Sequence, residues 1–454
     1  MSDALRADAE AIFRAAVERV DPAPMIRRAL SLRGEVLEVS TELGATSVDL
    51  SRFRRVVVTG FGKASARMAQ GVEAVLGDRI DGGLVVAKAG AGERLRRIRL
   101  VEASHPVPDE GSVRAAESLL ALAAGFDAET LVLTLVSGGG SALLCAPAVD
   151  AAGRPLLTLG EKQEVTRALL ASGATIHELN CVRKHLSRVK GGRLARGFGE
   201  ATSLALLLSD VVGDDLDVIA SGPTVADPTT YADALAVLDR YGVRGGAPRA
   251  AVRALEEGAA GRLEETPKAG DPALARTTNV LVGTNRQALL AAEARARALG
   301  YRTLVLTSRL TGEAREAALA LLGIAGDVAG AGFPLAPPAC VIAGGETTVT
   351  VKGTGKGGRN QELALAFLAA LPRARPAREV VLLAASTDGV DGPTDAAGAF
   401  ASPALAGRAA ALGLDPVAAL AANDSHRFHG ALGSLLRTGP TGTNVADVSI
   451  VLVR

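Results

Sequence analysis

The feature that most constrains the fold is an apolar run that ends in consecutive glycines. Residues 131–136 are Leu-Val-Leu-Thr-Leu-Val, and Ser137-Gly138-Gly139-Gly140-Ser141 follows them directly. A short apolar run bounded by turn residues is typical of a strand buried on both faces of a parallel sheet. A second run, 54–59, passes through a glycine turn at 60–65 into a helical pattern that reaches Val75. The repeated order of strand, glycine loop and helix predicts an α/β fold.

Both loops have a composition that suits an anionic ligand. Glycines allow positive φ, and the backbone N–H groups of such turns can converge on a phosphate. Because open α/β sheets bind ligands at the carboxyl ends of their strands, we predict ligand contacts for Lys63 and for residues 137–141. The alternatives are a solvated lysine at the helix end and a tight left-handed turn between packed elements.

A third glycine-rich segment carries two cations. Residues 353–362 are Gly-Thr-Gly-Lys-Gly-Gly-Arg-Asn-Gln-Glu; they follow an alternating run at 347–351 and precede an apolar helical pattern. The order predicts a strand, a glycine loop and a helix, with Lys356 and Arg359 as charged donors in the loop. This pattern favours a bound phosphate, with further contacts from Gly357, Gly358 and Asn360. A flexible surface turn is the alternative.

A basic helix face supplies further candidates. Asn180, Arg183 and Lys184 fall on adjacent turns of one predicted helix, and Lys190 continues the same face. These residues are predicted to contact substrate or phosphate. A face this basic can equally be solvated, and the sequence leaves that choice open.

Carboxylates stand at the ends of several predicted strands. Asp210 ends one apolar run, Glu346 ends another, and Asp388 opens a loop that also contains Asp391 and Asp395. Such groups can accept a hydroxyl proton or hold Mg²⁺ together with ligand phosphates. EF-hand spacing is absent. Asp210, Glu346 and Asp388 are therefore predicted metal ligands, and Asp210 or Asp388 is the predicted proton acceptor.

Length and charge narrow the domain organisation and the class of partner. The chain has 454 residues, a formal net charge of +1 and 3% aromatic residues, which argues against a nucleic-acid-binding protein. A chain of this length suggests two domains. Weak strand character predicts an inter-domain region at 244–277, between an N-terminal domain at 1–243 and a C-terminal domain at 278–454. A strand at 279–283 is expected to begin the second α/β series.

The sequence also indicates a compartment. Cys145, Cys181 and Cys340 lack disulfide or zinc spacing, which is typical of a reducing environment. The first ten residues mix charges where a signal peptide has its apolar core. The uncharged stretch 130–149 approaches membrane-span length, but glycines and Pro147 interrupt it. We expect a cytoplasmic protein without a membrane partner, and homo-oligomer formation is left open.

Together these motifs resemble the class II glycerate kinases, whose C-terminal half is called the MOFRL domain. The resemblance covers almost the whole chain, and the order and number of the motifs make it specific. The matching residues are Gly62-Lys63-Ala64, 137–141, 180–194, Ser209-Asp210, Gly344-Gly345-Glu346-Thr347, 357–362, Thr387-Asp388-Gly389, Asp391-Gly392 and 439–444.

The resemblance implies a two-domain α/β enzyme with a Rossmann-like parallel-sheet N-terminal domain, a mixed-sheet MOFRL domain and an active site in the cleft between them. It implies Mg²⁺-dependent transfer of the γ-phosphoryl group of ATP to D-glycerate, most often giving 2-phosphoglycerate. Lys63 and Arg359 match the functional lysine and arginine of the family. Phosphoryl transfer requires mainly alignment and neutralisation of charge, which glycine loops and cations can supply.

Two alternative functions remain open. Older naming within this family suggests an NAD(P)H-dependent hydroxypyruvate reductase, although Ser65 stands where a dinucleotide fingerprint has its third glycine. A non-catalytic regulator that binds phosphosugars could use the same glycine loops. Such a regulator would have no need for Asp210, Asp388 and Asp391 near them.

Overall fold

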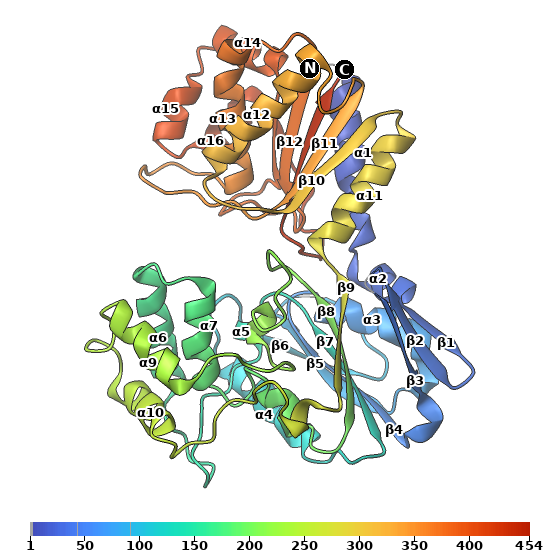
Figure 1. Ribbon diagram of the computed structural model, residues 1–454, viewed down its shortest axis with the longest axis vertical. Coiled ribbons are helices and arrows are strands. Elements are labelled where there is room, and N and C mark those ends of the chain that lie inside the picture. The colour runs from blue at the N-terminus through green and yellow to red at the C-terminus, as the bar shows by residue number, and fades with distance from the viewer. Residues whose placement is uncertain (1–2, 43, 91) are drawn as a thin grey trace. The chain divides into compact units, whose positions relative to one another are not determined.

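The computed structural model describes residues 3–42, 44–90 and 92–454, which form two compact units (Figure 1). The N-terminal unit consists of Pro22–Ser209 and Asp214–Val282. The C-terminal unit consists of Met1–Asp21, Asp210–Gly213 and Gly283–Arg454.

The N-terminal unit is built on a six-stranded sheet with the order β6-β5-β4-β7-β8-β9. The pairings from β6 through β8 are all parallel. Every residue of β7 is buried, which explains why its sequence is apolar throughout. The strands are β4 (Arg55–Phe61), β5 (Gly82–Lys88), β6 (Arg99–Ala103), β7 (Thr130–Val136), β8 (Thr202–Leu208) and β9 (Thr277–Gly283).

Two further layers complete this unit. A small antiparallel sheet of three strands lies beside helices α2 and α3 (Figure 1). Helices α6, α7, α9 and α10 form a separate bundle with its own apolar core. The elements are α2 (Pro22–Ala29), β1 (Leu30–Arg33), β2 (Val36–Thr41), β3 (Gly44–Asp49), α3 (Ser65–Leu76), α4 (Glu110–Ala123), α5 (Gly140–Leu143), α6 (Leu159–Ala171), α7 (Ile176–His185), α8 (Arg193–Gly197), α9 (Tyr231–Arg240) and α10 (Arg249–Ala259).

The C-terminal unit has a mixed sheet with the order β10-β11-β15-β12-β13-β14. Strand β15 runs antiparallel to both neighbours, while β10 and β11 are parallel. Helices α1 and α11 cover one face of the sheet, and α12 and α13 cover the other (Figure 1). The elements are α1 (Asp3–Arg19), α11 (Asn285–Ala298), β10 (Arg302–Leu310), α12 (Ala314–Ala331), β11 (Ala339–Gly345), α13 (Arg359–Ala374), β12 (Val380–Ser386), β13 (Gly398–Ala401), α14 (Pro403–Ala411), α15 (Pro416–Ala421), α16 (Ser425–Leu432), β14 (Leu435–Leu436) and β15 (Asp447–Val453).

The predicted fold class is confirmed, with a parallel sheet in the first unit and a mixed sheet in the second. The units differ in extent from the predicted domains 1–243 and 278–454. Helix α1 packs against α11 and β15 and so belongs to the C-terminal unit. Within the predicted inter-domain region, 244–277, helix α10 packs on α6 and α9 inside the N-terminal unit.

Two local predictions were wrong. The strand at 279–283, β9, completes the first sheet rather than beginning the second. No strand forms at 347–351, where the chain makes only an isolated bridge between Thr348 and Glu313, so the strand before the glycine segment is β11.

None of the described helices combines the length and the apolar composition needed to cross a bilayer.

The position of α1 generates a stability prediction. Phe13 is 1% exposed on this helix, whereas its neighbour Arg14 is exposed and pairs with Glu10. Phe13→Ala should lower the free energy of unfolding of the C-terminal unit by about 3–5 kcal/mol, because it removes a buried ring and leaves a cavity. Urea denaturation monitored by circular dichroism measures the change. Arg14→Ala is the matched control and should change stability by less than about 0.5 kcal/mol; equal effects of both substitutions would contradict the packing of α1.

Candidate functional site

The glycine loops that follow β4 and β7 are in direct contact. The two strands are parallel neighbours in register, with Phe61 beside Val136. The N–H of Lys63 donates to the Gly138 carbonyl at 2.9 Å, and the N–H of Ala64 donates to Ser137 Oγ at 3.1 Å. A Cβ on Gly62, whose φ is +130°, would stand 2.2 Å from Ser137 Oγ. Glycine is therefore required at residue 62 for the loops to meet.

The side chain of Lys63 lies beside Gly139 and His105. A Cβ on Gly139, with φ +80°, would be 3.1 Å from Lys63 Cγ and 2.9 Å from His105 Cδ2. Burial lowers the pKa of His105 to about 4, assisted by the charges of Lys63 and Lys88. His105 is therefore neutral near pH 7. Lys63 is exposed, and within the described part of the chain its amine forms no hydrogen bond or ion pair.

The loop offers backbone donors rather than hydroxyl donors. The N–H groups of Gly138 and Gly139 donate no hydrogen bond to the described residues. Ser221 Oγ donates to Asn180 Oδ1 at 2.8 Å, so its contact with Ser141 Oγ at 2.6 Å is donated by Ser141. The Ser141 hydroxyl hydrogen is thus already used, and an anion at this loop would be bound by N–H groups.

The basic residues on and after α7 do not share one environment: some lie near the glycine loop, and Lys184 lies among carboxylates. Lys190 Nζ donates to the Ser141 carbonyl at 2.8 Å, which ties the segment after α7 to the glycine loop. Arg183 is half-buried on the same helix. Asn180, one turn earlier, is buried against Ser221. The structure therefore connects Lys190 to the loop 137–141 directly and Asn180 to it through Ser221, while their role in binding stays a prediction.

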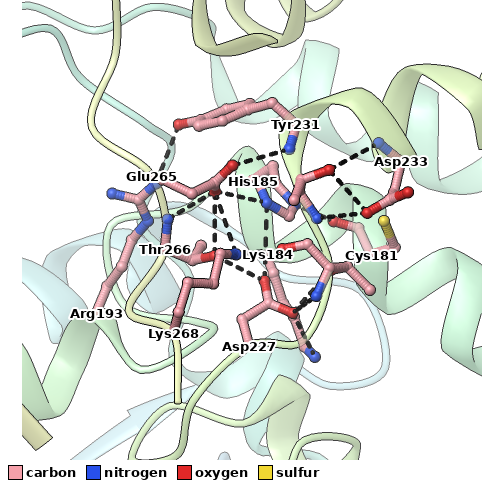
Figure 2. A network of polar contacts seen from close by, with 12 residues as sticks. Cys181, Lys184, His185, Arg193, Asp227, Tyr231, Asp233, Glu265, Thr266 and Lys268 are labelled. Atoms are coloured by element: carbon pink, nitrogen blue, oxygen red, sulfur yellow. Dashed lines mark hydrogen bonds and ion pairs between the residues drawn. The ribbon is translucent and has the colours of Figure 1, made fainter. Parts of the chain in front are cut away.

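Lys184 has a different environment. It is 1% exposed, and its Nζ contacts Asp227 at 3.2 Å (Figure 2) and Asp217 at 2.9 Å. Two carboxylates balance the charge of this buried amine, so it is not available to a phosphate. We assign Lys184 a structural role in place of the predicted substrate contact.

His185 extends this network, with both ring nitrogens facing acceptors (Figure 2). Nδ1 lies 2.7 Å from the Cys181 carbonyl oxygen, and Nε2 lies 2.9 Å from Glu265 Oε1. Burial opposes ionisation of Glu265, but its contacts with His185 and with backbone N–H groups lower its pKa to about 2. Glu265 is therefore ionised near pH 7, and the ring of His185 lies between it and the Cys181 carbonyl. The network is thus a set of paired charges that holds α7 in place.

In the C-terminal unit, Arg359 is paired with two carboxylates. Its Nε and Nη2 donate to the two carboxylate oxygens of Asp447 at 2.6 and 3.0 Å, and its Nη1 donates to Glu346 Oε1 at 2.6 Å. Burial alone would lower the pKa of Arg359, but Asp447 and Glu346 together raise it. Three N–H groups are engaged, which leaves one on each terminal nitrogen for a ligand.

Sequence reasoning missed Asp447. It is the first residue of β15 and lies opposite Gly345 of β11 and Ser386 of β12. This register places it between Glu346 and the loop that contains Asp388. The signal available in the sequence was an acidic residue at the start of the last buried strand.

The glycine segment before α13 differs from its predicted role. Asp391 is 2% exposed and caps the helix: it accepts from the N–H groups of Asn360 at 3.1 Å and Gln361 at 2.9 Å. A Cβ on Gly358 would be 2.3 Å from Asp391 Cγ, and one on Gly357 would be 2.1 Å from Ser425 Oγ. The N–H and side-chain amide of Asn360, which were predicted to bind phosphate, are thus bound to a protein carboxylate. The glycines make room for that packing.

Three predicted acidic residues lie in this unit. Asp388 Oδ1 accepts from Ser386 Oγ at 2.8 Å and from the N–H of Val390 at 2.9 Å, while its Oδ2 accepts no hydrogen bond from the described residues. Burial raises the pKa of Glu346, and although Arg359 opposes the rise, the charges of Asp447 and Asp210 add to it. Asp210 is therefore close to Glu346. No group of three or more potential metal ligands occurs among residues 3–42, 44–90 and 92–454.

Two family models match the chain. One, described as a domain of unknown function (DUF4147), matches residues 8–256. The other, the MOFRL family, matches residues 339–447. The first covers more than half of the chain, and the second covers most of the mixed sheet.

Named relatives match most of the chain. A protein of Agrobacterium vitis, provisionally named hydroxypyruvate reductase, is 46% identical over 88% of this chain and 87% of its own. A D-glycerate 2-kinase of Thermotoga maritima is 43% identical over 88% of this chain and 91% of its own. The crystal structure of a glycerate kinase from Thermotoga maritima superposes with a TM-score of 0.85 at 39% identity, covering 100% of both chains.

The proximity of Lys63 to His105 can be tested without an activity assay. Lys63→Met should raise the pKa of His105 from about 4 toward its ordinary value, because one of two nearby positive charges is removed while burial persists. A proton NMR titration of the imidazole, assigned with His105→Gln, measures the shift. Since folding lowers this pKa, the stabilising contribution of His105 is complete above pH ~6.5 and is lost as the pH falls toward ~4.

Arg167, exposed on α6 and without influence on His105, provides the control. Arg167→Met should leave the titration unchanged. If Lys63→Met also left the pKa of His105 unchanged, the ammonium group of Lys63 would not lie near the imidazole.

Proposed function

The chain belongs to the class II glycerate kinase family, and from this premise we propose that it transfers the γ-phosphoryl group of ATP to D-glycerate, giving 2-phosphoglycerate with Mg²⁺ as the metal. The observation that carries the proposal is the loop pair after β4 and β7. There an unpaired lysine stands beside backbone N–H groups that have no acceptor. An oxyanion of a phosphoryl group matches both kinds of donor.

Lys63 would provide charge to the transferring group. The transition state of phosphoryl transfer spreads negative charge over the equatorial oxygens, so preorganised donors lower the barrier. The contact between Gly62 and Ser137 fixes the backbone of Lys63, while the side chain stays free to follow the phosphate. His105 lies beside Lys63 and is neutral, so it neither repels the ammonium group of Lys63 nor adds charge to the site.

Arg359 would orient a ligand through its N–H groups rather than attract it through net charge. Asp447 and Glu346 balance its charge and fix the plane of its guanidinium. The remaining N–H groups on Nη1 and Nη2 then point in defined directions, which suits a phosphate or a carboxylate. The prediction that the active site lies in a cleft between the two domains stays a prediction.

Carboxylates of the C-terminal unit would complete the chemistry. Asp388 has one free oxygen and can accept the proton of the substrate hydroxyl. Glu346 and Asp210 repel each other, so a cation between them would relieve that repulsion; with only two protein carboxylates, the remaining ligands would be phosphate oxygens and water. Bound Mg²⁺ supplies charge neutralisation to the phosphates.

The reductase alternative has less support in the structure. In a dinucleotide-binding sheet, an acidic residue at the end of the second strand holds the ribose. Here β5, the strand after β4, ends in Lys88. Together with Ser65 in the turn, the lack of an acidic residue at this position disfavours NADH at the loops.

The function is tested by supplying ATP, Mg²⁺ and D-glycerate to the purified protein and following ADP release with a coupled assay. Phosphorus NMR of the product should show 2-phosphoglycerate, and excess EDTA should stop the reaction. A 3-phosphoglycerate product would overturn the regiochemistry. Oxidation of NADH with hydroxypyruvate in the absence of ADP release would favour the reductase, and ligand binding without turnover would favour a regulator.

The role of Lys63 generates a kinetic prediction. Lys63→Met should lower kcat by about a hundredfold or more, because the donor acts on charge that develops in the transition state. Lys352→Met, which removes an exposed lysine in the other unit, is the control and should keep kcat within about twofold. A folded Lys63→Met protein with the kcat of the native protein would refute this role.

A further inference from the structure

Three basic side chains lie close together in the N-terminal unit. Lys162 on α6 and Lys190 after α7 are 4% and 2% exposed, and Arg183 on α7 is half-buried. Burial lowers the pKa of all three, that of Lys162 to about 8, and the charge of Arg183 lowers the pKa of both lysines further. We refer to Lys162, Arg183 and Lys190 as the cation cluster.

No carboxylate of the described residues faces the cation cluster. Lys162 Nζ donates to the Leu186 carbonyl at 2.5 Å, and Lys190 Nζ donates to the carbonyls of Ser141 at 2.8 Å and Leu144 at 3.3 Å. Arg183 has no hydrogen-bond or ion-pair partner in the part of the chain described. The two lysines therefore donate only to neutral carbonyls, and the acidic group that acts on all three members of the cluster is the Cys145 thiol rather than a carboxylate.

The adjacent Lys184 shows that this arrangement is not a general property of the helix. Its buried amine contacts the carboxylates of Asp227 (Figure 2) and Asp217. Burial of a charge without a counter-charge is costly, and buried charges are normally paired. A cluster left unpaired beside a fully paired lysine indicates that the missing negative charge comes from a ligand.

The cation cluster is connected to the glycine loop. Lys190 holds the carbonyl of Ser141, and Ser141 contacts Ser221, which donates to Asn180 one helical turn before Arg183. The free N–H groups of Gly138 and Gly139 belong to the same loop. An anion that contacts Arg183 would therefore be placed near the loop we propose for the reacting phosphoryl group.

We propose that Arg183 binds the carboxylate of the hydroxy-acid acceptor, with Lys162 and Lys190 maintaining the positive potential behind it, so that the cluster selects anionic acceptors over neutral polyols. This inference rests on the proposed kinase function. The planar guanidinium matches a carboxylate through paired N–H groups. A phosphate of ATP would present the same chemistry, and the experiment below separates the two.

The test is steady-state kinetics of Arg183→Gln with D-glycerate and ATP varied separately and with glycerol as a neutral acceptor. The expected result is a rise of about 10- to 100-fold in KM for D-glycerate with the KM for ATP unchanged, together with weaker discrimination against glycerol. Arg183→Lys, which keeps the charge but loses the fork, should show a smaller rise. Arg167→Gln, on the exposed face of α6, should match the native enzyme.

Calorimetric binding of D-glycerate to the native protein and to Arg183→Gln separates this inference from the function on which it rests. Weaker binding to a variant with an unchanged melting temperature supports the inference. A rise in the KM for ATP alone would assign the cluster to the nucleotide and overturn it. Equal binding of D-glycerate by both proteins, with normal turnover by the native protein, would overturn the inference while the kinase function stands; a native protein without turnover would instead refute the function.

Discussion

The close approach of Gly62 to Ser137 is the constraint on which the proposed site depends. Two parallel strands, β4 and β7, end side by side, and their loops can touch only because residue 62 has no side chain. This contact aligns Lys63 with His105 and Gly139. It also fixes the loop whose Ser141 is held by Lys190 and Ser221. A single backbone contact thus determines where several charged and polar groups can meet a ligand.

The candidate cations of the two units differ in whether they have carboxylate partners. In the C-terminal unit, Arg359 is held by Asp447 and Glu346, so its charge is balanced and its direction is fixed. In the N-terminal unit, Lys63 has no ion-pair partner among the described residues, and Arg183 likewise has none. A balanced cation can orient a ligand but adds little net attraction, whereas an unbalanced one supplies attraction and is itself stabilised when an anion binds. Lys63 and Arg183 are therefore suited to attracting an anion, and Arg359 is suited to orienting one.

Much of the framework could be predicted from the sequence because periodicity and glycine position are local signals. The buried strand at 131–136 and the turn at 60–65 were identified from apolar runs and turn residues, and the structure forms both. The same reasoning from local sequence was wrong at 347–351, where alternating Thr and Val residues form only an isolated bridge between Thr348 and Glu313. Asn360 was predicted to bind phosphate, yet its N–H and its side-chain amide donate to Asp391, which is distant in sequence.

The charge partners of the site were the least predictable part. Sequence spacing places Arg183 and Lys184 on neighbouring positions of a basic helix, but it cannot show that only Lys184 meets carboxylates. Asp447 was missed because its importance arises from its register between β11 and β12. Such pairings depend on tertiary contacts between segments far apart in the chain, so they become visible only in the folded protein.

The central claim is that the loops after β4 and β7, together with the adjacent cations, form an anion site. The most direct measurement is a crystal structure of the protein grown or soaked with D-glycerate. The account predicts ordered density for the acid within hydrogen-bond distance of the N–H groups of Gly138 or Gly139 and of the guanidinium of Arg183. Density for the acid at a different location, with these N–H groups and Arg183 still without an anionic partner, would contradict it.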